Sequence, residues 1–211
     1  MNFTGYKCIK GNMVVEITER KSRFIASAGR VQTEEEARDF IECIKSDYRE
    51  ASHHVYAYVL AGNVPAARYS DDGEPHGTAG LPVLDVIRGR GLTGTIIVVT
   101  RYFGGTLLGT GGLARAYSGS AALCIEKAGT AEYIPGRIVK IEAEYHDLGK
   151  IQNFLNKKRV SVIDEDYGGR VIITALVPED GLMGFIDNIK DLTNAAADII
   201  PGEEKYIEKE D

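Results

Sequence analysis

The sequence predicts an α+β fold built from two domains, and three observations support this. Short apolar runs with strand-like content are interspersed with segments of helical period. The length of 211 residues is enough for two small domains, and 44% hydrophobic with 27% charged residues is typical of a globular chain. The rhythm of elements changes after Pro135-Gly136, so we expect a short linker there, between an N-terminal domain (1–134) and a C-terminal domain (135–211).

The first domain is expected to contain four strands and three helices. The strands are predicted at 13–18, 22–31, 53–62 and 95–103, and the helices at 33–48, 79–91 and 112–129. Thr33 and Glu36 have the capping-box spacing, Pro82 falls in a first helical turn, and Gly129 is a helix stop. Residues 63–78 are expected to form a loop, which at this length is often functional.

The second domain is predicted to follow the order β-α-β-β-α-β, which is the ferredoxin-like arrangement. Its strands are expected at 137–145, 160–167, 169–177 and 196–207, and its helices at 146–158 and 178–193. Gly168-Gly169 marks the hairpin between the two middle strands, and Asp147 is expected to cap the first of these helices.

Composition excludes several classes of protein. No apolar run approaches the ~20 residues of a membrane span. The first residues do not form a signal peptide, so a cytoplasmic location is expected. Cys8, Cys43 and Cys124 are far apart and form no CxxC pair, which favours buried thiols over a disulfide framework or a zinc site.

The charge is unevenly distributed along the chain. A net charge of −6 argues against wholesale coating of nucleic acid. Between residues 86 and 127, however, Glu126 is the only acid. The basic residues of this segment are Arg88, Arg90, Arg101, Arg115 and Lys127. The overall negative charge therefore does not exclude a local basic surface on this protein.

The glycine-rich stretch TRYFGGTLLGTGGLARAY (100–117) is the main candidate site. It joins the most apolar strand to an alanine-rich helix, and a helix N-terminus with free N–H groups favours an anion. Gly104 and Gly109 have the outer spacing of a P-loop, but no lysine follows. The G-x-G-x-x-A match at 109–114 lacks the βαβ context of a dinucleotide site. We therefore expect no cofactor.

Two interpretations of this stretch stay open. In the first, the glycines permit positive φ and close packing of backbone on backbone. In the second, Thr110 caps the helix, exposed N–H groups hold an anion, and Arg115 adds charge. The candidate binding residues are Arg101, Gly104, Gly105, Gly109, Thr110, Gly111, Gly112 and Arg115. A similar turn stands at 77–81 (GTAGL), and the anion site gains support if the two helix N-termini converge.

The acidic loop 68–80 is a second candidate. In an extended conformation Asp72, Glu74 and His76 point to one side, where they could hold a divalent metal or carry acid–base chemistry. No nucleophile or fourth ligand stands nearby, and DDGEP is also typical of an exposed turn, so we expect no metal. On the preceding strand Tyr56 and Tyr58 share one face, a pattern more typical of core than of a base-stacking platform.

Four motifs together resemble the bacterial YigZ/IMPACT family. They are KSRFIA (21–26), HHVYAY (53–58), SDDGEPHGTAG (70–80) and VVTRYFGGTLLGTGGLARAY (98–117), and the resemblance covers essentially the whole chain. It implies an N-terminal fold shared by ribonuclease PH, a ribosomal small-subunit protein domain and the fourth domain of elongation factor G, with a βαβ unit in a mixed or antiparallel sheet. It also implies a ferredoxin-like C-terminal domain similar to the last domain of elongation factor G.

The resemblance bears on function as well. Eukaryotic relatives bind the activator of the amino-acid-starvation kinase and restrain its signalling to translation initiation, whereas bacterial relatives have no settled biochemical activity. The sequence shows no separate N-terminal domain for that eukaryotic partner, so we do not expect that interaction here.

We therefore expect a translation-associated binding protein with roles in the regulation of translation and the stress response. It would contact the ribosome, RNA or a translation-related protein through the glycine-rich face. The alternatives are a metal- or phosphate-dependent hydrolase that uses the loop 70–80, and a regulator that binds only proteins. Enzymatic activity is not favoured. We expect no membrane contact, no DNA specificity, and a monomer or small homo-oligomer.

Overall fold

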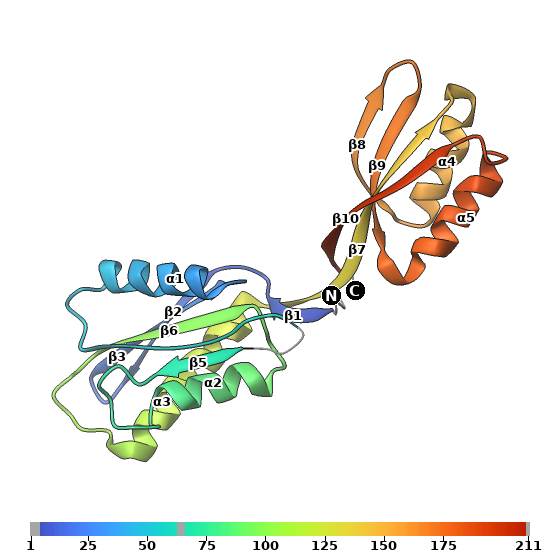
Figure 1. Ribbon diagram of the computed structural model, residues 1–211. Coiled ribbons are helices and arrows are strands. Elements are labelled where there is room, and N and C mark those ends of the chain that lie inside the picture. Colours follow the sequence, from blue (N-terminus) through green and yellow to red (C-terminus); the bar gives the residue numbers. More distant parts are fainter. Residues whose placement is uncertain (1–4, 63–65, 210–211) are drawn as a thin grey trace. The chain divides into compact units, whose positions relative to one another are not determined.

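The computed structural model describes residues 5–62 and 66–209 and shows an α+β protein (Figure 1). Within these residues it contains five α-helices, one short 3-10 helix and two β-sheets. The α+β class predicted from the sequence is therefore confirmed. The chain divides into two compact units, Met1–Glu132 and Tyr133–Asp211. None of the described helices is long and apolar enough to cross a membrane.

The first unit is built on a five-stranded antiparallel sheet with the order β2-β3-β6-β4-β5. Its strands are β2 (Met13–Glu19), β3 (Ser22–Arg30), β4 (His53–Val59), β5 (Ala67–Ser70) and β6 (Thr95–Tyr102). β6 is the central strand, and all but its last residue are buried, in line with its apolar sequence. The expectation of a loop is wrong for β5, since pairing with β4 makes this short segment an edge strand. Residues 63–65 of the expected loop lie outside the described residues.

Helices cover both faces of this sheet. α1 (Glu34–Asp47) packs on one face, whereas α2 (Gly80–Gly89) and α3 (Gly109–Ala128) pack on the other (Figure 1). Side chains alternate along β6, so Ile96 and Val98 join the core beneath α1, and Ile97 and Val99 join the core beneath α2 and α3. β5 and β6 run parallel because both are antiparallel to β4 between them. α2 and α3 therefore begin at the same end of the sheet.

Local signals set the ends of the helices. Thr33 Oγ1 accepts a hydrogen bond from the backbone N–H of Glu36 at 3.1 Å, which confirms the predicted cap of α1. The Glu36 carboxylate accepts in return from the N–H of Gln32, at 2.7 Å, rather than from Thr33. Gly129 ends α3 with φ 69°, as predicted. α3 begins at Gly109, three residues before the expected start, so the GTGG segment forms its first turn.

The second unit has the predicted order β-α-β-β-α-β. Its elements are β7 (Thr130–Ala143), α4 (Tyr145–Lys157), β8 (Ser161–Tyr167), β9 (Val171–Pro178), a 3-10 turn (Glu179–Gly181), α5 (Leu182–Leu192) and β10 (Asp198–Glu208). The antiparallel strands of this unit follow the order β10-β7-β9-β8. The short strand β1 (Tyr6–Ile9) belongs to the first unit.

Two local expectations in this half of the chain are wrong. Pro135 and Gly136 lie inside β7 rather than in a linker, because β10 and β9 pair with the strand at these positions. Asp147 does not cap α4, whose N-cap is Glu144. Asp147 is buried in the first turn and accepts a 2.8 Å hydrogen bond from Lys150, which lowers the pKa of its carboxyl.

The three cysteines are free thiols. Cys8 and Cys124 are buried as expected, and burial raises the pKa of Cys124 to about 11. The expectation is wrong for Cys43, which is exposed because it lies outside the buried stripe of α1 formed by Ala37, Ile41 and Ile44.

Candidate functional site

The loop between β6 and α3 packs closely on the turn between β2 and β3. A Cβ atom on Gly104 would lie 2.1 Å from the carbonyl carbon and oxygen of Lys21, so only glycine fits there. The Gly104 N–H donates to Ser22 Oγ at 3.2 Å. Gly105 and Gly109 have positive φ angles of 78° and 70°. Gly104 therefore permits close packing on backbone, whereas Gly105 and Gly109 supply positive φ in open space, with no atom within 4 Å of a Cβ built on either.

The start of α2 is occupied by a carboxylate of this chain. Asp71 accepts backbone hydrogen bonds from Gly77 at 2.8 Å, Ala79 at 3.1 Å and Gly80 at 2.8 Å. Burial raises the pKa of the Asp71 carboxyl, but the three hydrogen bonds outweigh burial and lower it overall. The GTAGL turn thus binds an internal anion. Sequence reasoning missed this role because Asp71 precedes the helix by more residues than a local cap does.

The start of α3 differs from that of α2. Its N-cap residue is Leu108, and no described side chain caps it. Thr110 lies inside the first turn, so the expectation that Thr110 caps α3 is wrong. The N–H groups of a first helical turn have no intrahelical acceptor, and they carry the positive end of the helix dipole. This helix N-terminus is therefore available to a ligand in a way that the N-terminus of α2 is not.

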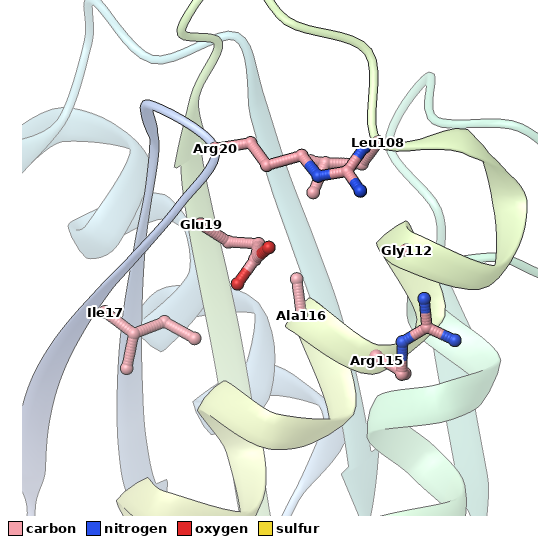
Figure 2. Close-up of a pocket in the computed structure, with 7 residues that line it drawn as sticks. All are labelled: Ile17, Glu19, Arg20, Leu108, Gly112, Arg115 and Ala116. Carbon is pink, nitrogen blue, oxygen red and sulfur yellow. The ribbon is translucent and has the colours of Figure 1, made fainter.

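A pocket of about 230 Å³ opens beside the first turn of α3 (Figure 2). It is lined by Ile17, Glu19, Arg20, Leu108, Gly112, Arg115 and Ala116. The pocket lies between this turn and the turn that joins β2 to β3. Of the predicted binding residues, Gly112 and Arg115 line it, and sequence reasoning missed Glu19 and Arg20. The turn between β2 and β3 is distant from α3 in sequence, so no local sequence pattern indicates that its residues lie beside this helix.

Three charged side chains set the electrostatics of this pocket. In Figure 2, Arg20 extends across the pocket toward Leu108, and Glu19 directs its carboxylate into it. The Arg115 guanidinium lies 3.8 Å from the position of a Cβ atom on Gly111, so it folds back along the first turn of α3. Glu19, Arg20 and Arg115 make no ion pair with any residue that the structure describes. Two cations and one anion leave the pocket with one surplus positive charge.

Arg101 is buried, so the expectation that it belongs to an exposed basic face is wrong. Only 4% of the residue is exposed, and its Nη1 donates to Glu74 Oε1 at 2.5 Å. Its guanidinium also lies 5.4 Å from the ring centres of both Phe24 and Phe103. Tyr117 Oη donates to the same Glu74 oxygen at 2.8 Å, and burial, followed by the charge of Glu74, raises the pKa of Tyr117. This network joins β6, α3 and the acidic loop.

The acidic loop does not assemble a metal site. Asp72 turns away with φ 43° and accepts from the N–H of His54 at 2.6 Å, whereas Glu74 is buried against Arg101. His76 is exposed and lies 3.7 Å from Asp71. The extended arrangement in which Asp72, Glu74 and His76 would share one side is not formed, because the loop adopts turns, the alternative that DDGEP also indicated. The described residues contain no group of three His, Cys, Asp or Glu side chains that could hold a metal ion.

The basic residues between 86 and 127 do not all lie at the pocket. Arg88 lies in the last turn of α2, and Arg90 follows that helix. Lys127 lies in the last turn of α3, about 18 Å along the helix from Arg115. With Arg101 buried, Arg115 is the one member of this set at the pocket.

Two family models match the chain. The Impact N-terminal domain matches residues 20–125, and a domain of unknown function, DUF1949, matches residues 141–196. The IMPACT family member YvyE of Bacillus subtilis (strain 168) is 42% identical over 194 residues, which cover 92% of this chain and 89% of YvyE. The chain belongs to the IMPACT family. The predicted YigZ/IMPACT resemblance is thereby confirmed.

IMPACT family membership extends over both units. YigZ of Escherichia coli (strain K12) is 33% identical over 187 residues, covering 88% of this chain and 92% of YigZ. The "Protein IMPACT homolog" of Saccharomyces cerevisiae is 35% identical over 96 residues, which are 44% of this chain and 37% of the yeast protein. A crystal structure of a hypothetical protein has a TM-score of 0.63 and 30% identity, and covers 95% of this IMPACT family chain and 98% of its own.

Proposed function

We propose that this IMPACT family protein is a binding protein that regulates translation, and that its first unit binds a phosphate group of RNA at the start of α3. One observation carries the proposal. The uncapped first turn of α3 lies beside a pocket lined by Arg20 and Arg115, whereas the first turn of α2 is filled by Asp71. A phosphate group fits both the N–H groups of the turn and the arginine side chains.

The link to translation is supported by the family resemblance. The resemblance implies that eukaryotic relatives restrain signalling to translation initiation. It also implies that the N-terminal domain shares its fold with a ribosomal small-subunit protein domain and the fourth domain of elongation factor G, and that the C-terminal domain is similar to the last domain of elongation factor G. The proposal therefore includes these two fold likenesses. It also includes the ribosome as the source of the RNA and the cytoplasm as the location of the protein.

The distribution of charge between the two units agrees with this proposal. Residues 1–132 contain 15 basic and 15 acidic residues, whereas residues 133–211 contain 10 basic and 16 acidic residues. The net charge of −6 therefore falls entirely on the second unit, and a neutral first unit does not repel RNA as a whole. With two arginines at the pocket, the salt dependence of binding to single-stranded RNA should have a slope of roughly −1.4, which weakens binding about tenfold between 50 and 300 mM salt.

The direct test is fluorescence anisotropy of a labelled single-stranded RNA of about 20 nucleotides, titrated with the full chain. Arg115→Ala is expected to weaken binding about fivefold or more, because it removes a charge-assisted contact to phosphate. Glu19→Gln is expected to strengthen binding two- to threefold, because it removes the negative charge from the pocket. Arg88→Ala is the matched control, since Arg88 is an exposed arginine at the far end of α2.

Equal losses in Arg115→Ala and Arg88→Ala would show that binding does not use the pocket. Binding that is unchanged between 50 and 300 mM salt would exclude a phosphate contact. Co-sedimentation with ribosomes at the same two salt concentrations then tests the source of the RNA. Pelleting that weakens with salt and with Arg115→Ala supports the ribosome, and protein that stays in the supernatant at both concentrations contradicts it.

A further inference from the structure

A second concavity lies on the other face of the first unit. It is a groove of about 400 Å³ between α1 and the strands β4 and β5, and its lining includes Arg38, Ile41, Tyr56 and Arg68. Tyr56 and Tyr58 belong to the sheet face that α1 covers, whereas α2, α3 and the phosphate pocket lie on the opposite face. The groove is therefore separate from the pocket at α3.

The groove runs beside a sheet edge with which no further strand of the described residues pairs. β5 is the last strand in its sheet, and its register pairs Arg68 with Tyr58 and Ala67 with Val59. The N–H of Leu60 donates to the carbonyl of Ala66 at 2.8 Å. In an antiparallel ladder hydrogen-bonded pairs alternate with non-hydrogen-bonded ones, so the next hydrogen-bonded pairs between β4 and β5 are Tyr58 with Arg68 and Tyr56 with Ser70. Ala67 and Tyr69 occupy the alternate positions, and their backbone N–H and C=O groups point away from β4.

The side chains of β5 connect this edge to the groove. Arg68 and Ser70 pair directly with Tyr58 and Tyr56, and directly paired residues share one face of a sheet. A strand added to Ala67 and Tyr69 would therefore place alternate side chains against the groove, and the others on the α2 side. Backbone hydrogen bonds to the edge would supply affinity, and the groove would supply specificity.

The charges of the groove favour a carboxylate. Arg68 is paired with Glu34 at 3.0 Å, and Lys45 with Glu42 at 3.3 Å. Arg38 is exposed and makes no ion pair with any residue in the described ranges 5–62 and 66–209. The five charged side chains of the lining carry one surplus positive charge, which lies at Arg38. Beside it, Ile41 and the half-buried ring of Tyr56 offer an apolar surface.

We infer that β5 and the groove dock an extended segment of a partner protein, in which carboxylate side chains alternate with apolar ones. The segment adds as a strand to the edge at Ala67 and Tyr69. One of its carboxylates pairs with Arg38, and the methylene groups of the next carboxylate side chain on the same face pack on Tyr56, whereas the apolar side chains lie on the α2 side. This surface is additional to the proposed RNA site, so the protein can hold RNA on one face of the sheet and a partner protein on the other.

The test uses the full chain and two blocked synthetic heptapeptides, Glu-Val-Glu-Val-Glu-Val-Glu and its counterpart with lysine at each glutamate. In a nuclear magnetic resonance titration, the glutamate peptide is expected to shift the amide signals of Ala67 and Tyr69 and to slow their hydrogen exchange. Arg38→Glu is expected to weaken binding at least tenfold, since a contact to a charged group is lost and a repulsive one is introduced. Ala67→Pro removes one outward N–H and is expected to weaken binding to a similar extent.

Arg88→Glu is the matched control, because it makes the same charge change on the opposite face of the sheet, and it is expected to alter binding less than twofold. Three results would each overturn the inference: no change at Ala67 and Tyr69 with about 5 mM peptide, equal binding of the lysine peptide, or equal losses in Arg38→Glu and Arg88→Glu. RNA binding should be unchanged in Arg38→Glu, so failure here and failure of the proposed function are distinguishable.

Discussion

Replacing Glu74 by glutamine should strongly destabilise the first unit, because it removes one charge from a buried ion pair. The side chains of Arg101 and Glu74 are only 5% and 4% exposed, and their charged atoms are 2.5 Å apart. A glutamine oxygen can still accept the hydrogen bond from Tyr117, but it leaves the guanidinium without a counter-charge. Removing one partner of a buried pair costs about 3–5 kcal/mol.

Native-state hydrogen exchange measures this cost within the first unit. The amides of Ile97, Val98 and Val99 lie in the central strand β6, so their exchange should require the opening of this unit. A loss of about 3 kcal/mol accelerates the exchange of such amides roughly 150-fold. The method also reports on this unit separately from the second, which has its own core.

The control is Glu16→Gln, which removes the same charge from an exposed pair with Arg23 at 2.9 Å. Its effect should be far smaller, because solvent screens surface ion pairs. Combining Glu74→Gln with Arg101→Met should restore part of the lost stability, because no charge then remains buried alone. If Glu74→Gln accelerates the exchange of β6 amides no more than Glu16→Gln does, the ion pair does not stabilise this unit.

Two further predictions concern the turns that begin the helices. Asp71→Ala should destabilise the protein by about 1–2 kcal/mol at pH 7, since three N–H groups lose their acceptor. The folded-state pKa of Asp71 is lowered, so its stabilisation is present above the ordinary value of 3.8 and is lost as the pH falls below it. Thermal denaturation followed by circular dichroism should show a gap between the variant and the native protein that narrows at pH 3, and a constant gap would contradict a role for the charge. Gly104→Ala should cost about 2 kcal/mol or more, because its Cβ would lie 2.1 Å from Lys21 backbone, whereas Gly111→Ala should be neutral or stabilising by up to about 1 kcal/mol. Equal melting temperatures for these two variants would refute the close-packing argument.

Local physical chemistry made most of the elements predictable. The Thr33 cap, the apolar run of β6 and the stop at Gly129 each act within a few residues of the structure that they specify. The β-α-β-β-α-β order of the second unit was predictable for the same reason, since its strands and helices have clear periods of their own. β5 was missed because four residues, ARYS, carry no period, and pairing with β4 makes them a strand.

The candidate site was only partly predictable, because its charges are decided by residues distant in sequence. Arg101 stands in a glycine-rich stretch that looks exposed, yet Glu74, 27 positions away, allows it to be buried. Two similar glycine turns begin α2 and α3, and the sequence alone does not distinguish them. Folding places Asp71 on the first turn and leaves the second open beside Arg20.

The sequence by itself thus determined the family, the α+β class, most of the helices and strands, and the presence of Arg115 near a helix start. Those features depend on patterns and contacts that span a few residues. Only the tertiary structure decided which charges are neutralised, which helix N-terminus is filled, and which sheet edge is open beside a groove. Those properties depend on side chains and strands that the fold brings together from distant parts of the chain. The energy of an electrostatic interaction depends on the distance between two charges in space and not on their separation along the sequence.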